Sequence, residues 1–216
     1  MSDFALHWLE AAAPIGRWRA AVEAGVAEGW SAASRRADLP QMDIVLQVVP
    51  GAVIPELGMV GHAYRPSCFS LTLDPANPNF AEAMAAGALP RQVAHELMHC
   101  LRFAAIGYDH NLGDALVSEG LCGHFVHECL GTPPEPWERA LTSAQLAEWL
   151  PRAEAQAGGR HDHAAWFFGR GPDAPPRWAG YSLGFHLVGR FLARHPEARP
   201  STLRGMHAAR LLKDAF

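Results

Sequence analysis

The sequence changes character once along its length, and this change limits the possible folds more than any other feature. Residues 43–49, 61–64 and 68–73 are short runs with strand-like composition, separated by proline, glycine and serine, and they predict strands. From Phe80 onward the apolar residues follow helical spacing instead. A small antiparallel or mixed sheet packed on many helices predicts the α+β class.

The first 36 residues predict helices. Ser2 is a candidate cap for a segment that reaches about Ala13, and Pro14 suits the first turn of a second segment. No repeat and no linker divides the chain, so we expect a single domain. Its expected parts are helices in 1–36, strands in 43–73 and a helical part in 88–216, all within one domain over 1–216.

Local signals place the ends of three later helices. Pro90 is suited to open a helix that Gly107 would stop. Asn111 predicts the start of the next helix, and Gly131 predicts its end. Thr142, with a glutamine three residues later, has the pattern of a capping box.

Charge and composition exclude several kinds of partner. The chain has 18 basic and 22 acidic residues, a formal net charge of −4, and its basic residues form no cluster, so we expect no nucleic-acid or anionic-membrane partner. No apolar stretch approaches the roughly 20 residues of a membrane span, and His7 and Glu10 interrupt any export signal. The 4 cysteines are expected to be free thiols. These features predict a cytoplasmic protein.

The residues His95-Glu96-Leu97-Met98-His99 carry the clearest chemical signal. On a helix, His95 and His99 lie one turn apart on the same face, where both imidazoles can reach one zinc ion. Glu96 stands beside this pair, where a carboxylate can take a proton from a water molecule activated by the metal. The pattern therefore predicts a catalytic zinc site on the helix that begins near Pro90.

A catalytic zinc ion needs a third protein ligand. The metzincin pattern would require glycine at position 102 and histidine at position 105, but Arg102 and Ala105 stand there, which excludes that class. A ligand from a following helix is the remaining option, and Glu119 is our prediction for it. The alternatives are Asp114, His110, His124 and His127.

At this point the chain resembles known metallopeptidases. The motif at His95–His99 followed by Ser118–Leu121 is similar to the gluzincins. More closely, residues 43–192 resemble a bacterial family of uncharacterised, predicted zinc-dependent proteases, in which an ordered series of motifs recurs. The series is represented here by His95–His99, Leu116–Leu121, Trp166–Gly169 and Gly180–Phe185.

The resemblance implies a zincin-like fold and further roles. It implies that Glu119 binds the metal and that Tyr181 donates a hydrogen bond to the developing oxyanion. Packing within a helix bundle is the alternative role for Tyr181. One position departs from the pattern: thermolysin-like enzymes carry an aspartate four residues after the glutamate ligand, and Gly123 stands there. The group that orients His95 is therefore unassigned.

The function predicted from the sequence is a zinc (Zn2+) metallopeptidase that hydrolyses peptide bonds. Glu96 is the predicted general base, and a peptide or protein is the predicted substrate. The alternative is a non-catalytic binding or scaffold protein in which a metal ion stabilises the helices. A structural zinc site would have four protein ligands, and Glu96 would then have no task.

Overall fold

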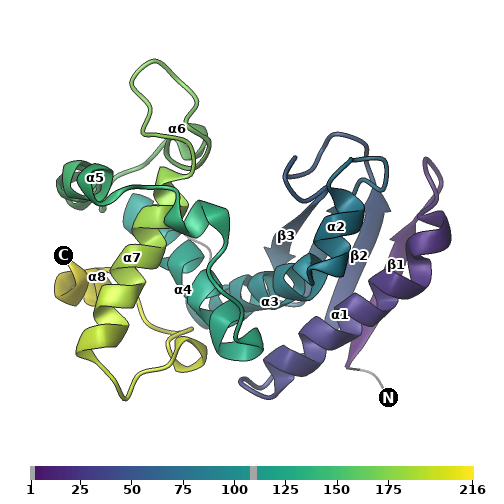
Figure 1. Cartoon of the computed structure of the whole chain (residues 1–216). Helices are drawn as coiled ribbons and strands as arrows, with labels where there is room; N and C mark the ends of the chain where they lie inside the picture. The colour runs from purple at the N-terminus through teal and green to yellow at the C-terminus, as the bar shows by residue number, and fades with distance from the viewer. Residues whose placement is uncertain (1–2, 108–110) are drawn as a thin grey trace. The chain divides into compact units, whose positions relative to one another are not determined.

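The computed structural model describes residues 3–107 and 111–216 (Figure 1). The chain divides into two compact units, Met1–Ala104 (unit 1) and Ala105–Phe216 (unit 2). A four-stranded mixed sheet lies in unit 1, and helices make up unit 2, so the predicted α+β class is confirmed. The expectation of one domain over 1–216 stays a prediction.

Unit 1 contains the sheet, whose strands stand in the order β1-β2-β4-β3. β1, β2 and β4 are parallel neighbours, while β3 pairs antiparallel with β4 and forms an edge. The three predicted strands are confirmed to within two residues at each end. The bounds are β1 Phe4–Leu9, β2 Met42–Val48, β3 Met59–Arg65 and β4 Cys68–Leu73.

The helix predicted to reach Ala13 is wrong, because residues 4–9 form the strand β1. Its side chains alternate between half-buried and exposed, as in a strand with one covered face. Its hydrogen-bonding partner is β2, nearly 40 residues later (Phe4 pairs with Met42), so the pairing that stabilises the strand is absent from the local sequence. Ser2, the predicted cap, lies outside the described residues.

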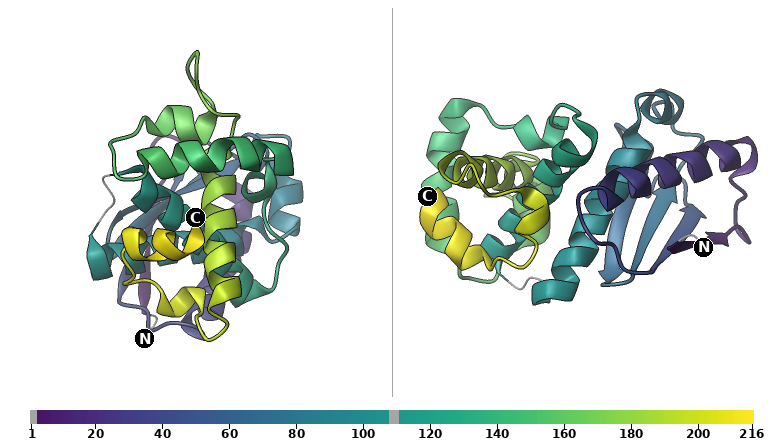
Figure 2. Two further views of the ribbon diagram at one scale, coloured as in Figure 1. Left: turned by 90° about the vertical axis from the view of Figure 1, so that its left-hand side faces the viewer. Right: turned by 90° about the horizontal axis from the view of Figure 1, so that it is seen from below.

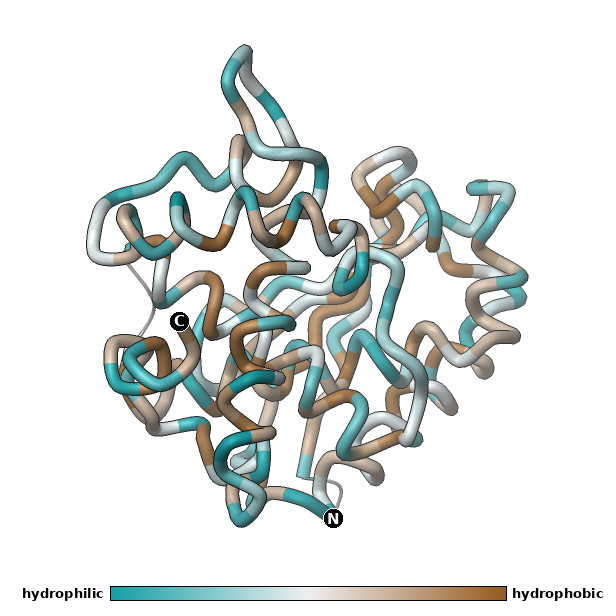
Figure 3. Tube along the Cα trace, turned by 60° about the vertical axis from the view of Figure 1, so that its left-hand side comes forward, coloured by the Kyte–Doolittle hydropathy of each residue, from teal (hydrophilic) through white to brown (hydrophobic). Residues whose placement is uncertain are grey.

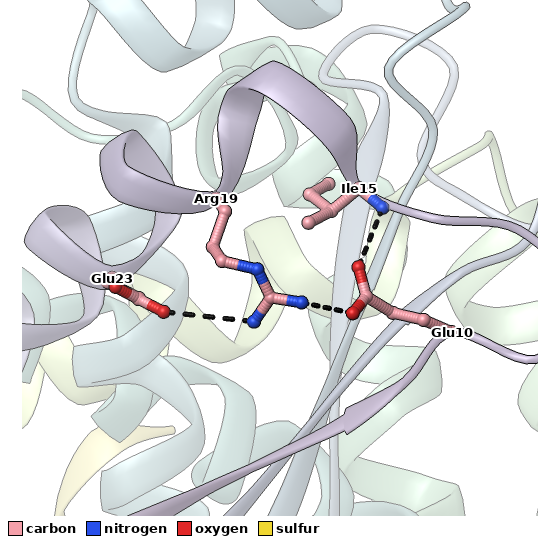
Figure 4. A network of polar contacts seen from close by, with 4 residues as sticks. All are labelled: Glu10, Ile15, Arg19 and Glu23. Carbon is pink, nitrogen blue, oxygen red and sulfur yellow. Dashed lines mark hydrogen bonds and ion pairs between the residues drawn. The ribbon is translucent and has the colours of Figure 1, made fainter.

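A polar network closes the turn between β1 and α1 (Arg19–Ser34) (Figure 4). The Glu10 carboxylate accepts hydrogen bonds from Ile15 N, at 3.1 Å, and from the Arg19 guanidinium. Arg19 also lies 3.8 Å from Glu23 and stacks over the Trp8 ring, 4.1 Å from its centroid. The turn therefore depends on residues from both elements that it joins.

One face of the sheet is apolar and faces helices. The register aligns Trp8, Leu46, Leu71 and Gly61 in one row across the four strands. Figure 2 shows α1 running along the strands. Unit 1 also contains the 3-10 turn η1 (Gly16–Trp18), α2 (Phe80–Ala85) and α3 (Ala88–Ile106) as far as Ala104.

α1 and α3 approach each other closely at two glycines one turn apart. A Cβ atom at Gly25 would lie 2.8 Å from Leu89 Cδ2, and one at Gly29 would lie 2.7 Å from the carbonyl oxygen of Pro90. Any larger residue would push the helices apart. The first turns of α3 are therefore held in place by α1.

Unit 2 is built from helices, and its predicted caps are confirmed. Asn111 caps α4 by accepting from Asp114 N at 2.8 Å, and Gly131 ends the helix with φ 66°. Thr142 forms the predicted capping box of α5. The helices are α4 Leu112–Leu130, α5 Ser143–Gln156, α6 His163–Phe168, α7 Ala179–Arg194 and α8 Ala208–Ala215, with 3-10 turns η2 Pro136–Arg139 and η3 Pro200–Thr202.

α4 and α7 cross with their backbones in contact. A Cβ atom at Gly184 would overlap the Leu116 carbonyl oxygen and lie 3.2 Å from Gly120 N. A Cβ atom at Gly120 would lie 2.8 Å from Val188 Cγ2. Glycines on both helices permit this close approach, and because they must face each other, they fix the register in which the helices cross.

Hydrophobic residues recur along the helices, and hydrophilic residues occupy many of the connecting loops (Figure 3). Within the described part of the chain, no helix combines the length and the apolar character that crossing a bilayer requires.

Candidate metal centre

α3 carries the predicted zinc motif in a largely buried helix. It begins at Ala88, two residues before the predicted Pro90, and ends at Ile106, before Gly107 with φ 81°. The predicted helix is therefore confirmed. Its middle turns are buried on most sides, so the side chains of the motif have few alternative positions.

His95 and His99 converge at one point on the helix surface. Their Nε2 atoms lie 3.1 Å apart, and the ring centroids lie 4.9 Å apart. Two nitrogens bound to one tetrahedral zinc ion at 2.0–2.1 Å would be separated by about 3.3 Å. The two imidazoles are therefore arranged as a pair of nitrogen ligands for one metal ion. His99 is buried and His95 is half-buried.

Glu96 lies between the helix and the edge strand β3. Its side chain is only 4% exposed. A Cβ atom at Gly61 would lie 2.6 Å from Glu96 Cδ, so the carboxylate occupies the space that any other residue at position 61 would fill. The neighbouring turn of α3 contacts the same glycine, since Gln92 Oε1 accepts from Gly61 N at 3.1 Å.

The cysteines of unit 1 are protonated thiols rather than reactive groups. Burial, together with the Glu96 charge, raises the pKa of Cys100 to about 12. Burial also raises the pKa of Cys68. A thiol of this kind is a poor nucleophile at neutral pH.

Glu119 lies on α4 in unit 2, and its side chain is half-buried. Three of the alternative ligands have structural contacts. Asp114 closes the first turn of α4 with Asn111. His124 stacks on the Phe185 ring and lies 3.0 Å from the Phe185 carbonyl oxygen, and His127 lies 2.7 Å from that of Thr132. The fourth, His110, lies outside the described residues.

Tyr181 lies on α7 within an aromatic cluster of unit 2. Its ring meets Phe167 edge to face at 5.0 Å, and Phe168 at 6.5 Å. Gly180 allows this approach, because a Cβ atom there would lie 2.6 Å from Phe167 Cδ1. Two motifs noted in the sequence, Trp166–Gly169 and Gly180–Phe185, therefore pack against each other.

Gly123 leaves room for a carboxylate from another element. A Cβ atom at Gly123 would lie 2.8 Å from Glu138 Cδ, and Glu138 is 7% exposed. Glu138 Oε2 accepts from Glu135 N at 2.7 Å. Thermolysin-like enzymes carry an aspartate at the position of Gly123. In this protein the space beside Gly123 is occupied by the buried side chain of Glu138 from η2.

Comparison with known proteins identifies the family. A family model described as "Predicted Zn-dependent protease (DUF2268)" matches residues 24–213. The chain belongs to this family. A relative in Bacillus subtilis (strain 168), described as "Uncharacterized protein YjfC", is 30% identical over 121 residues, which is 50% of this chain and 40% of YjfC. The chain thus aligns with less than half of that relative.

The family agrees with two predictions from the sequence. The resemblance to predicted zinc-dependent proteases is confirmed, and so is zinc as the cofactor that the family description names.

The structure adds three residues that were not predicted from the sequence: Gly61, Gln92 and Glu138. Gln92 offered the only local signal, because it lies one turn before Glu96 on the same helix. The other two come from distant segments.

Proposed function

We propose that the protein is a zinc-dependent hydrolase, a metallopeptidase of gluzincin type. In this proposal His95, His99 and Glu119 hold the zinc ion through two imidazole nitrogens and a carboxylate oxygen. This set leaves the fourth position open, as in other catalytic zinc sites. Glu96 is the general base, and Tyr181 donates a hydrogen bond to the oxyanion.

The observation that carries the proposal is the arrangement of three side chains on α3. The Nε2 atoms of His95 and His99 lie 3.1 Å apart, as a shared metal ion requires. The Glu96 side chain is 4% exposed and lies against β3. A purely structural metal site would not need a buried carboxylate in this position.

The roles of the side chains follow from their chemistry. A bound zinc ion supplies a Lewis acid that polarises a carbonyl group and makes a water molecule more acidic. Glu96 takes a proton from that water as it attacks the carbonyl carbon, and gives the proton to the leaving amine. The Tyr181 hydroxyl donates a hydrogen bond to the carbonyl oxygen as negative charge develops there.

The proposed substrate is a peptide or a protein. The edge strand β3 lies beside the proposed catalytic helix, and we propose that its edge, apart from the Gly61 N–H that Gln92 binds, accepts an extended peptide as an additional strand. Nucleic acid is not an expected partner, because the net charge is −4 and the basic residues are scattered. The cysteines Cys68, Cys100, Cys122 and Cys129 are buried and are not in disulfides, as expected in the reducing cytoplasm, which is our proposed location.

Metal content and hydrolysis measured on the same samples test the proposal. We expect about one zinc ion per chain and cleavage of an unstructured protein such as casein. His95→Ala and His99→Ala should lose zinc, whereas His62→Ala, which changes an exposed histidine of β3, should keep it. Glu96→Gln should keep zinc and lower hydrolysis by about 10²-fold or more.

The third ligand has its own test. Glu119→Ala should lower zinc affinity sharply, and Asp114→Asn should not. If Glu119→Ala binds zinc as tightly as the parent, the ligand assignment is wrong. Full zinc content without hydrolysis of any peptide or protein would instead favour the alternative, a non-catalytic binding protein stabilised by its metal ion.

A further inference from the structure

Two side chains of α3 contact the same residue of the edge strand. Gln92 Oε1 accepts a hydrogen bond from Gly61 N at 3.1 Å, and the Glu96 carboxyl group lies where a Cβ atom of Gly61 would be. Gln92 and Glu96 are four residues apart, so they stand one above the other on one face of the helix. Gly61 therefore meets α3 at two consecutive turns.

Both side chains are inside the protein. Gln92 is 6% exposed and Glu96 is 4% exposed. A backbone N–H that is partly removed from water needs an acceptor, and Gln92 supplies one for the half-buried Gly61 at the outer edge of the sheet. Met59 and Ala63 are the neighbours of Gly61 on the helix-facing side of β3, and both are buried. The strand has little freedom to move away from the helix here.

We infer that Gln92 is a positioning residue for the general base. It holds the Gly61 backbone against the Glu96 side chain, and that backbone then restricts the rotamers open to the carboxylate. The inference rests on the proposed function, in which Glu96 moves the proton. It assigns no contact between Gln92 and the substrate, since Gln92 acts through Gly61.

The geometry explains why glycine occupies position 61. In the row of aligned residues across the sheet, Trp8, Leu46 and Leu71 carry large side chains, and only Gly61, which lies against Glu96, carries none. An alanine at 61 would force the carboxylate into another rotamer or move the strand. A shift of about 1 Å in a catalytic group can lower turnover by about 10²-fold.

Paired variants test the hydrogen bond. Gln92→Met removes the acceptor and keeps the length of the side chain. Gln47→Met is the matched control, because Gln47 on β2 donates to Thr72 Oγ1 at 2.9 Å, within the sheet. We expect Gln92→Met to lower kcat by about tenfold or more, with KM and zinc content nearly unchanged. We expect Gln47→Met to leave kcat close to that of the parent.

A second measurement needs neither substrate nor metal. Thermal unfolding of the metal-free protein is compared for the parent, Gly61→Ala, Glu96→Ala and the double variant. We expect Gly61→Ala to lower Tm by about 3–8 °C in the parent background, because the new Cβ atom collides with Glu96. In the Glu96→Ala background most of this loss should disappear.

The outcomes separate the two proposals. If the parent carries zinc and cleaves peptides, but Gln92→Met has the same kcat as the Gln47→Met control, this inference is overturned and the proposed function stands. An equal loss of Tm for Gly61→Ala in both backgrounds also overturns it. If the parent cleaves no peptide or protein, the proposed function itself fails, and the positioning role fails with it.

Discussion

Two glycines, one in each unit, make close contacts with different kinds of atoms. In unit 1, Gly61 leaves space for the carboxylate of Glu96. In unit 2, Gly184 leaves space for the backbone of Leu116, where α7 crosses α4. A tight contact is therefore not in itself a sign of function. The Gly61 contact meets the side chain that we propose as the general base, whereas the Gly184 contact sets the distance between two helices.

The largest expected effect tests whether unit 2 contributes chemistry as well as packing. Tyr181→Phe removes only a hydroxyl group, so the aromatic contacts with Phe167 should remain. We expect kcat to fall by about 10²–10³, or roughly 2.7–4 kcal/mol, with little change in KM, as for the loss of one oxyanion donor. Steady-state kinetics with a peptide substrate gives both constants. Parental turnover would place Tyr181 with the packing residues.

The next effect concerns the crossing of α4 and α7. Gly184→Ala puts a Cβ atom onto the backbone of Leu116, which cannot turn aside as a side chain can. We expect a loss of about 3 kcal/mol in the free energy of unfolding, at the upper end of the usual cost of overpacking. Urea denaturation measures it.

Gly189→Ala is the matched control on the same helix. Its new Cβ atom would lie 3.3 Å from Nε2 of His124, which is a side-chain atom at a tight contact distance rather than overlapping backbone. This variant should cost much less than Gly184→Ala. Equal losses for the two variants would show that the helices separate easily and would remove the distinction between the two glycine contacts.

A smaller effect is expected from acid, through histidines of unit 2. Burial lowers the pKa of His124, against the opposing effect of its hydrogen bond to Phe185 O. Burial also lowers the pKa of His161, and burial with the Arg190 charge lowers that of His186. Below about pH 6.5 the unfolded chain therefore binds more protons than the folded chain at these positions.

The sign of the pH effect follows from this difference. The stability that these histidines contribute is present above about pH 6.5 and is lost as the pH falls through their lower folded pKa values. Urea denaturation at pH values from 7.5 down to 5 should show the free energy of unfolding falling below about pH 6.5. His124→Gln should flatten the profile, and the exposed His207→Gln should not. A flat parental profile would contradict the prediction.

The smallest effect is expected in the turn before α1. Arg19→Ala removes the contacts with Glu10 and Glu23 and the stacking on Trp8. Because these groups are partly exposed to water, we expect a loss of less than about 1 kcal/mol on thermal unfolding. A loss as large as that of Gly184→Ala would show that β1 depends on this turn rather than on pairing with β2.

Much of unit 2 could be predicted from the sequence because its signals are local. The cap Asn111, the terminal Gly131 and the capping box at Thr142 act within a few residues of their partners, and the structure confirms each of them. The same holds for the spacing of His95 and His99 on α3. The strand at residues 4–9 was missed because the strand it pairs with begins at Met42.

The sequence by itself determined the arrangement of His95 and His99 on α3, since helical periodicity alone puts two imidazoles one turn apart, with Glu96 beside them. It also determined the class of the fold through the change from strand-like runs to helical spacing. Only the tertiary structure decided that Gly61 faces Glu96, that Gln92 binds the Gly61 backbone and that Glu138 fills the space beside Gly123. These contacts join residues that are 15 to 35 positions apart in the sequence. They depend on how the elements pack against one another, which helical or strand periodicity within one segment does not specify.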